Sequence, residues 1–231
     1  MNPLKVLAFD ADDTLWENEP YFREVEERFG EWMEEYLPRH TTARELLRTE
    51  IENIGLYGYG IKAFMLSMIE TALRISDHTI PLSAIDKIIK LGRDMMTKPV
   101  ILLPGVEQVL RHFQPKYRLV MATKGDLLDQ ERKLKKSGLE KYFHHIEIMS
   151  EKKEADYEKL IRHLDIHPSE FAMIGNSLKS DVLPVIALGG TGIHVPFHTT
   201  WAHEAVEAEI DHPNFLPVKT ITDIVTLLSK S

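Results

Sequence analysis

Polar side chains that could do chemistry occur in four groups, each directly after a short apolar run. They are Asp10, Asp12, Asp13 and Thr14; Thr123 and Lys124; Lys152 and Lys153; and Asn176 with Asp181. A carboxylate can cleave a phosphate monoester as a nucleophile. Carboxylate and amide oxygens also suit Mg²⁺, which binds a few protein oxygens together with water and phosphate. These residue types favour catalysis on a phosphate, provided that the fold brings the groups together.

The apolar runs before these groups are predicted strands. With one further run they are Lys5 to Phe9, Arg118 to Ala122, His145 to Met149, Phe171 to Ile174 and Gly192 to Val195. Helical patterns over 126–137, 154–164 and 181–188 separate the later strands. Strands that alternate with helices of this length predict an α/β fold with a parallel sheet. Ligands bind outside the carboxyl ends of such strands, so we expect the four groups to meet in one crevice.

The segment 16–98 has no strand pattern, and its apolar residues recur at helical spacing over 22–36, 61–75 and 85–96. Ser83-x-x-Asp86 and Thr42-x-x-Glu45 resemble helix starts. We therefore predict an all-helical domain over 16–98, inserted into an α/β domain made of 1–15 and 99–231. Tyr57-Gly58-Tyr59-Gly60 should be a loop with unusual backbone angles, either a substrate-contacting loop or a plain turn.

Composition excludes several other classes of protein. The chain has 231 residues, of which 43% are hydrophobic, a net charge of −8 and no cysteine. The acidic charge argues against nucleic-acid or anionic-membrane partners, and the lack of cysteine excludes disulfides and thiolate metal sites. The sequence shows neither a signal peptide nor an apolar run of transmembrane length, so we expect a cytoplasmic protein.

Taken in order, the four groups resemble the motifs of the haloacid dehalogenase superfamily. The matching residues are Asp10-x-Asp12-x-Thr14, Thr123, Lys152 and Gly175-Asn176-Ser177-x-x-x-Asp181. The resemblance implies a Rossmann-like core with strand order 5-4-1-2-3. It also implies that the helical insert is a cap that opens and closes, with hinges near Trp16 to Glu17 and Lys98 to Leu103.

The same resemblance implies a Mg²⁺-dependent phosphohydrolase that acts on a small phosphorylated metabolite through an aspartyl-phosphate. In it, Asp10 is the nucleophile and Asp12 is the general acid and base, while Asp10, the carbonyl of Asp12 and Asp181 bind the metal. Such a role for Asp12 favours a pKa nearer neutrality than that of a free carboxylate. The side chains expected at the phosphate are Asp10, Thr123, Lys124, Lys152 and Asn176. Lys152 fits the motif better than Lys153.

Other functions are open. A haloacid dehalogenase of the same family would release a halide, which needs no proton, so Asp12 together with Asp181 favours phosphate. A phosphonate-cleaving enzyme would need a Schiff-base lysine in the cap, where Lys62 is the only candidate. A non-catalytic binding protein could keep the same fold.

Two residues depart from the family pattern. Asp13 stands where the family often has glycine, and Asn176 stands where it often has aspartate, which removes a charge and is expected to lower metal affinity. His194, His198 and His203 lie close in sequence, but Pro196 breaks the spacing of a helical zinc site. The sequence does not define the substrate or the oligomeric state.

Overall fold

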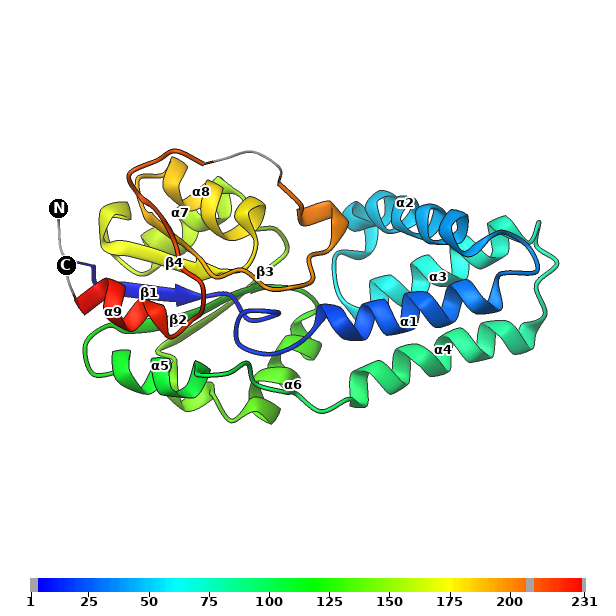
Figure 1. Cartoon of the computed structure of the whole chain (residues 1–231), viewed down its shortest axis with the longest axis horizontal. Helices are drawn as coiled ribbons and strands as arrows, with labels where there is room; N and C mark the ends of the chain where they lie inside the picture. The colour runs from blue at the N-terminus through cyan, green and yellow to red at the C-terminus, as the bar shows by residue number, and fades with distance from the viewer. Residues whose placement is uncertain (1–3, 207–209, 230–231) are drawn as a thin grey trace. The chain divides into compact units, whose positions relative to one another are not determined.

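A six-stranded parallel sheet forms the centre of the α/β part of this computed structural model, which describes residues 4–206 and 210–229 (Figure 1). Its strands are β1 (Val6–Phe9), β2 (Arg118–Lys124), β3 (His145–Met149), β4 (Phe171–Gly175), β5 (Thr191–His194) and β6 (Phe215–Pro217). The order is β3-β2-β1-β4-β5-β6. This confirms the α/β Rossmann-like fold and the predicted order of the first five strands. The sequence analysis missed β6, a three-residue edge strand that is too short to show a periodic pattern.

The chain divides into two compact units. The first consists of Met1–Glu19, Val100–Lys124 and Gln130–Ser231, and the second consists of Pro20–Pro99 and Gly125–Asp129. The assignment of these parts as a catalytic core and a cap stays a prediction.

Helices cover both faces of the sheet in the first unit. They are α5 (Val106–Phe113), α6 (Leu127–Ser137, whose first turn belongs to the second unit), α7 (Glu154–His163), α8 (Leu183–Ala187) and α9 (Asp223–Ser229). Figure 1 shows α5 and α9 on one side of the sheet and α7 and α8 on the other. Burial on both faces explains why the strands read as short apolar runs rather than as alternating patterns.

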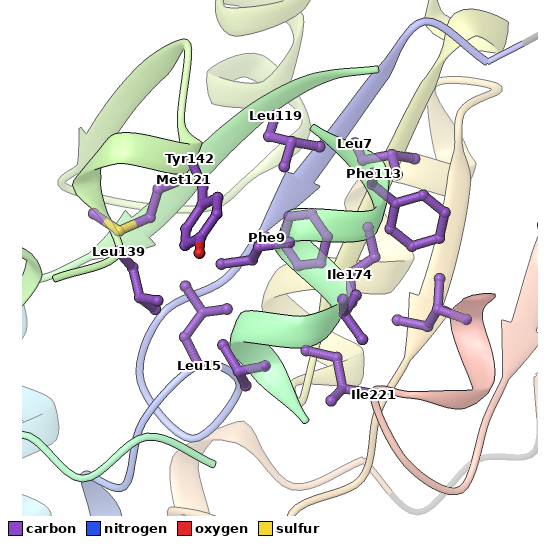
Figure 2. Close-up of a cluster of buried hydrophobic side chains, with 14 of the residues drawn as sticks. Leu7, Phe9, Leu15, Phe113, Leu119, Met121, Leu139, Tyr142, Ile174 and Ile221 are labelled. Carbon is purple, nitrogen blue, oxygen red and sulfur yellow. The ribbon is translucent and has the colours of Figure 1, made fainter. Parts of the chain in front are cut away.

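Successive residues of β1 point to opposite faces, as in any strand. Leu7 and Phe9 belong to a buried cluster with Phe113 of α5 and Met121 of β2 (Figure 2). Val6 and Ala8 belong to a second cluster, with Tyr157 and Leu160 of α7 and Val185 of α8. The strand that carries Asp10 at its end is therefore fixed from both sides.

The second unit is helical, as predicted, with α1 (Glu19–Trp32), α2 (Arg39–Tyr57), α3 (Ile61–Ile75) and α4 (Leu82–Thr97). Both predicted helix starts are wrong. The helix α2 begins after Pro38 and α4 after Pro81, because proline fits the N-terminal positions of a helix and starts each one earlier. Positive φ angles of 70° at Gly58 and 96° at Gly60 confirm the unusual backbone of the loop between α2 and α3. No helix within the described residues is long and apolar enough to span a membrane.

Candidate active site

A buried lysine lies between two carboxylates at the carboxyl end of the sheet. Lys152, in the loop after β3, forms ion pairs with Asp10 and with Asp181, the latter at 2.7 Å. The exposed fractions of Lys152, Asp10 and Asp181 are 3%, 7% and 1%. Charged groups that are buried so completely need partners of opposite charge. The structure thus brings together three of the predicted site residues, which come from three different motifs.

The backbone around β4 positions Asp181. Gly175 ends β4, and a Cβ atom there would lie 2.1 Å from Asp181 Oδ2, so only glycine leaves room for this carboxylate. Ser177 N donates to the same oxygen at 3.0 Å. Asp181 lies in a π-helical turn, η3 (Leu178–Val182), that precedes α8, so the helix predicted over 181–188 was only partly correct.

Burial and neighbouring charges set the ionisation of this group. Burial raises the pKa of Asp10 to about 7; Lys152 opposes the rise, and Asp181 and Asp12 add to it. Burial alone would lower the pKa of Lys152, but Asp10 and Asp181 outweigh burial and raise that pKa above its ordinary value. The lysine therefore stays charged throughout the physiological range.

The neighbouring lysine lies elsewhere. The side chain of Lys153 is 75% exposed, and its ammonium group is 4.0 Å from Glu151. Lys152 is thus the lysine that contacts Asp10, as the spacing of the motif had favoured.

Asp12 is held by groups that the sequence analysis did not identify. Its Oδ1 accepts hydrogen bonds from Trp16 Nε1 at 2.7 Å and from Lys133 Nζ at 2.6 Å. Gln130 Nε2 donates to Asp12 Oδ2 at 3.2 Å and to Thr123 Oγ1 at 2.7 Å. The many charges of the helix that carries Gln130 and Lys133 favour a solvated face, but these two side chains are largely buried and face Asp12. The sequence did contain one signal for their position. Gln130 and Lys133 are three residues apart, so they share a helix face with Leu134, which is buried.

Polar atoms from the first and the fourth motif converge beside Asp10. The amide group of Asn176 lies 3.2 Å from Asp10 Oδ2 and 3.3 Å from the backbone oxygen of Asp12. Thr14 Oγ1 donates to Asp10 Oδ2 at 3.2 Å. The hydrogen bonds of Asn176 are satisfied when its amide nitrogen faces these oxygens. A half-turn of the amide would present its oxygen to a cation and would complete a set of oxygen ligands, which is the chemistry that Mg²⁺ prefers.

A metal ion at this position would therefore depend partly on neutral ligands. The described residues contain no cluster of three or more His, Cys, Asp or Glu side chains arranged for a metal ion. The backbone oxygen of Asp12 and the amide of Asn176 would complete the set supplied by Asp10 and Asp181. The donor types fit Mg²⁺, with one negative charge fewer than an aspartate at 176 would give.

Asp13 has a structural role that explains the departure from glycine. Its φ of 60° lies in the left-handed region, which glycine adopts freely and which Asp and Asn tolerate best among the other residues. Its carboxylate accepts hydrogen bonds from the N–H groups of Asn18, at 2.8 Å, and Glu19, at 3.0 Å, where α1 begins. Burial, and then the charge of Asp12, raises the pKa of Asp13 to about 8.

We expect Asp13→Asn to stabilise the protein at pH 9 and to change its stability little at pH 5. The pKa of Asp13 is higher in the folded protein than in the unfolded chain. Between about pH 4 and pH 8 the folded protein therefore binds one more proton than the unfolded chain, and its stability falls as the pH rises through this range. Asparagine keeps the acceptor oxygen and carries no charge. Urea unfolding at both pH values, in EDTA, measures the difference. A variant that is equally destabilised at both values would contradict a buried charge at this position.

Lys124 and Glu204 form a second charged group close to Asp181. Lys124 Nζ donates to Glu204 Oε1 at 2.6 Å and to Ser180 Oγ at 2.9 Å. Ser177 Oγ and Ser180 Oγ both donate to Glu204 Oε2. Burial alone would raise the pKa of Glu204, but Lys124 and the two hydroxyl groups lower it to about 2. No pattern in the sequence indicated Glu204, which lies after β5 in a single 3₁₀ turn, η4 (Ala202–Glu204).

The three histidines close in sequence have different partners. His194 contacts the backbone oxygen of Asn176 at 3.0 Å. The ring of His198 lies 4.1 Å from that of Phe197, and the ring of His203 lies 4.9 Å from that of Trp201. His194 is therefore the one that touches a predicted site residue.

Comparisons with known proteins identify the class and the family. A model of the haloacid dehalogenase-like hydrolase family matches residues 4–189. The chain is thus a hydrolase. It belongs to the haloacid dehalogenase-like hydrolase family, as its motifs predicted. A comparison with curated protein sequences found no match.

Solved structures agree with this family. A haloacid dehalogenase-like family hydrolase from Xanthomonas campestris is 36% identical, with a TM-score of 0.87 over 98% of this chain and 92% of that one. The HAD-hydrolase YfnB from Bacillus subtilis, bound to magnesium, is 14% identical, with a TM-score of 0.70 over 99% and 100% of the two chains. A 2-haloacid dehalogenase from Pseudomonas syringae is 17% identical, with a TM-score of 0.66 over 98% and 99%. The latter two similarities show the fold alone.

Proposed function

We propose that this hydrolase is a Mg²⁺-dependent phosphatase that acts on a small phosphorylated metabolite through an aspartyl-phosphate on Asp10. The observation that carries the proposal is the arrangement at the end of β1. A buried carboxylate, Asp10, is paired with a buried lysine, and a second carboxylate, Asp12, follows two residues later. That second carboxylate is partly exposed, with 26% of its side chain accessible.

The reaction follows from these two aspartates. A carboxylate oxygen of Asp10 attacks phosphorus and forms an acyl-phosphate bond, while the bond from phosphorus to the leaving oxygen breaks. Asp12 gives its proton to that oxygen, so an alcohol leaves. Asp12 then takes a proton from water, which attacks phosphorus and releases inorganic phosphate and the free carboxylate of Asp10.

The other groups stabilise charge and position the phosphate. Lys152 keeps its positive charge beside Asp10, which offsets part of the repulsion between this carboxylate and an anionic substrate. Thr123 Oγ1 and the amide of Asn176 offer hydrogen bonds to phosphoryl oxygens. Lys124 is a candidate for the same role, but its ammonium group also binds Glu204.

Magnesium fits the oxygen ligands described above, and bound Mg²⁺ would neutralise negative charge on the phosphoryl group. Asp10, the backbone oxygen of Asp12 and Asp181 are the proposed ligands, with Asn176 in addition. The magnesium bound to the similar Bacillus subtilis hydrolase supports the choice of metal. We further propose that the helical unit is the cap that excludes water and selects the substrate. A cytoplasmic location also stays a prediction.

Dehalogenation is the second candidate, because a structurally similar protein is a 2-haloacid dehalogenase. In that reaction Asp10 would attack carbon and form an ester, and a halide would leave. Release of a halide needs neither a proton nor a metal ion, so it gives no role to Asp12 as an acid. The presence of Asp12 together with Asp181 therefore supports a phosphate ester as the substrate, and not a haloacid.

One experiment separates the two reactions. The purified protein is incubated with an aryl phosphate or with 2-chloropropionate, each with Mg²⁺ and with EDTA, and phosphate and chloride are measured. We expect phosphate release that requires Mg²⁺ and that Asp12→Asn lowers by about 10²- to 10⁴-fold, and no chloride. Release of chloride in EDTA, with heavy oxygen from labelled water entering the Asp10 carboxylate, would establish the dehalogenase instead. In the phosphatase, water attacks phosphorus, so the heavy oxygen appears in phosphate.

A further inference from the structure

Two residues of α6 reach the proposed general acid from far away in the sequence. Lys133 Nζ lies 2.6 Å from Asp12 Oδ1, and only 16% of the lysine side chain is exposed. Gln130 Nε2 lies 3.2 Å from Asp12 Oδ2. Residues three apart on a helix share one face, so a single face of α6 presents both groups to Asp12.

Gln130 also fixes the end of β2. It is 1% exposed, and its amide nitrogen donates to Thr123 Oγ1 at 2.7 Å and to the backbone oxygen of Lys124 at 2.9 Å. Its amide oxygen is buried and has no hydrogen-bond partner among the described residues. A buried polar atom without a partner lowers stability, so a contribution to stability alone does not explain a glutamine here.

The two oxygens of Asp12 are bound unequally. Oδ1 accepts two short hydrogen bonds, from Lys133 and from the indole of Trp16, whose distance is 2.7 Å. Within the described residues Oδ2 accepts one longer bond, from Gln130. The bonds to Oδ1 are shorter and more numerous, and one of them comes from a charged donor, so Oδ1 is held more firmly and Oδ2 is the freer oxygen.

We propose that Gln130 and Lys133 are positioning residues, which orient the Asp12 carboxylate so that Oδ2 delivers the proton to the leaving oxygen. Trp16 and Lys133 fix Oδ1, and Gln130 sets the position of Oδ2 relative to Thr123. The inference rests on the proposed phosphatase function, in which Asp12 is the general acid. In this inference, α6 orients the group that transfers the proton and does not bind the substrate.

The test uses the dependence of the rate on the leaving group. An alkoxide leaving group needs the proton, whereas a nitrophenolate leaves nearly as well without it. We expect Lys133→Met and Gln130→Met to lower kcat/KM for ethyl phosphate by about 10- to 100-fold, part of the effect of general acid catalysis. For 4-nitrophenyl phosphate we expect kcat/KM to fall less than about threefold. This ratio covers the reaction only up to departure of the leaving group, so it excludes the second step, in which Asp12 acts as the base for both esters.

Three controls separate positioning from damage to the fold. Lys136→Met changes an exposed lysine on the same helix and should leave both rates unchanged. Lys133→Arg keeps the positive charge and should restore part of the ethyl phosphate rate. In an Asp12→Asn background Lys133→Met should have no further effect, because its action passes through Asp12.

The outcomes are distinct. Equal losses on both substrates, or a further loss in the Asp12→Asn background, would overturn the positioning role and leave the phosphatase standing. If the wild-type protein released phosphate from neither ester in Mg²⁺, both proposals would fail. If Lys133→Met did not fold, the charge-retaining Lys133→Arg would still decide, since a selective loss on ethyl phosphate supports positioning and an equal loss on both esters overturns it.

Discussion

Asp10→Asn should lower the turnover of an aryl phosphate by about 10⁴- to 10⁶-fold, the range expected when an enzyme loses its nucleophile. The amide has nearly the same shape as the carboxylate, but it cannot form an acyl-phosphate. Asp10 lies at the end of β1, where its N–H group donates to Ile174 O at 2.8 Å, so the backbone should keep its position in the variant. Substitution removes a negative charge from a buried site, which should leave folding intact.

The same variant tests the covalent intermediate directly. Wild-type protein mixed with substrate and quenched in acid should carry one phosphoryl group on Asp10, found by peptide mass spectrometry, and hydroxylamine should remove it. The Asp10→Asn protein should carry none. Asp156→Asn, on the nearby helix α7, serves as a control that keeps both turnover and the phosphoryl group. Substantial turnover in Asp10→Asn, or a phosphoryl group on another residue, would rule out Asp10 as the nucleophile.

Residue types and their order along the chain were enough to predict the fold and to select three side chains that the structure brings together. Parallel strands that are buried on both faces read as apolar runs, and a catalytic side chain at the end of such a run is visible in the sequence. Asp10, Lys152 and Asp181 were found in this way, and the structure brings them into contact. The three-residue strand β6 gave no such pattern.

The residues around the motifs could not be predicted, because their role depends on tertiary contacts. Lys133 lies on a helix whose many charges look like a solvated surface, and only the packing of α6 shows that this lysine faces Asp12. Glu204 ends the single 3₁₀ turn η4, which is too short to show a periodic pattern, so nothing in the sequence linked it to Lys124. The positive φ of Asp13 likewise required the structure.

Lys152→Met should both inactivate the enzyme and destabilise it, by about 3 to 5 kcal/mol in the absence of metal. The substitution keeps an apolar stem of similar length but leaves Asp10 and Asp181 buried without their shared cation. The adjacent Lys153→Met removes an exposed lysine and should change the free energy of unfolding by less than about 0.5 kcal/mol. Urea unfolding of the two variants in EDTA measures this contrast at neighbouring positions.

The pH and metal dependence of Lys152→Met should show that charge, and not packing, is the cause. The folded pKa of Asp10 is already raised to about 7, and loss of the lysine should raise it further. Stability from such a group is present at low pH and is lost as the pH rises through the folded pKa, so the destabilisation should be larger at pH 8 than at pH 5. Mg²⁺ should stabilise the variant more than the wild-type protein, because a bound cation replaces part of the missing charge. A destabilisation independent of both pH and Mg²⁺ would mean that Lys152 stabilises the fold through its packing, and that the buried carboxylates do not need its charge.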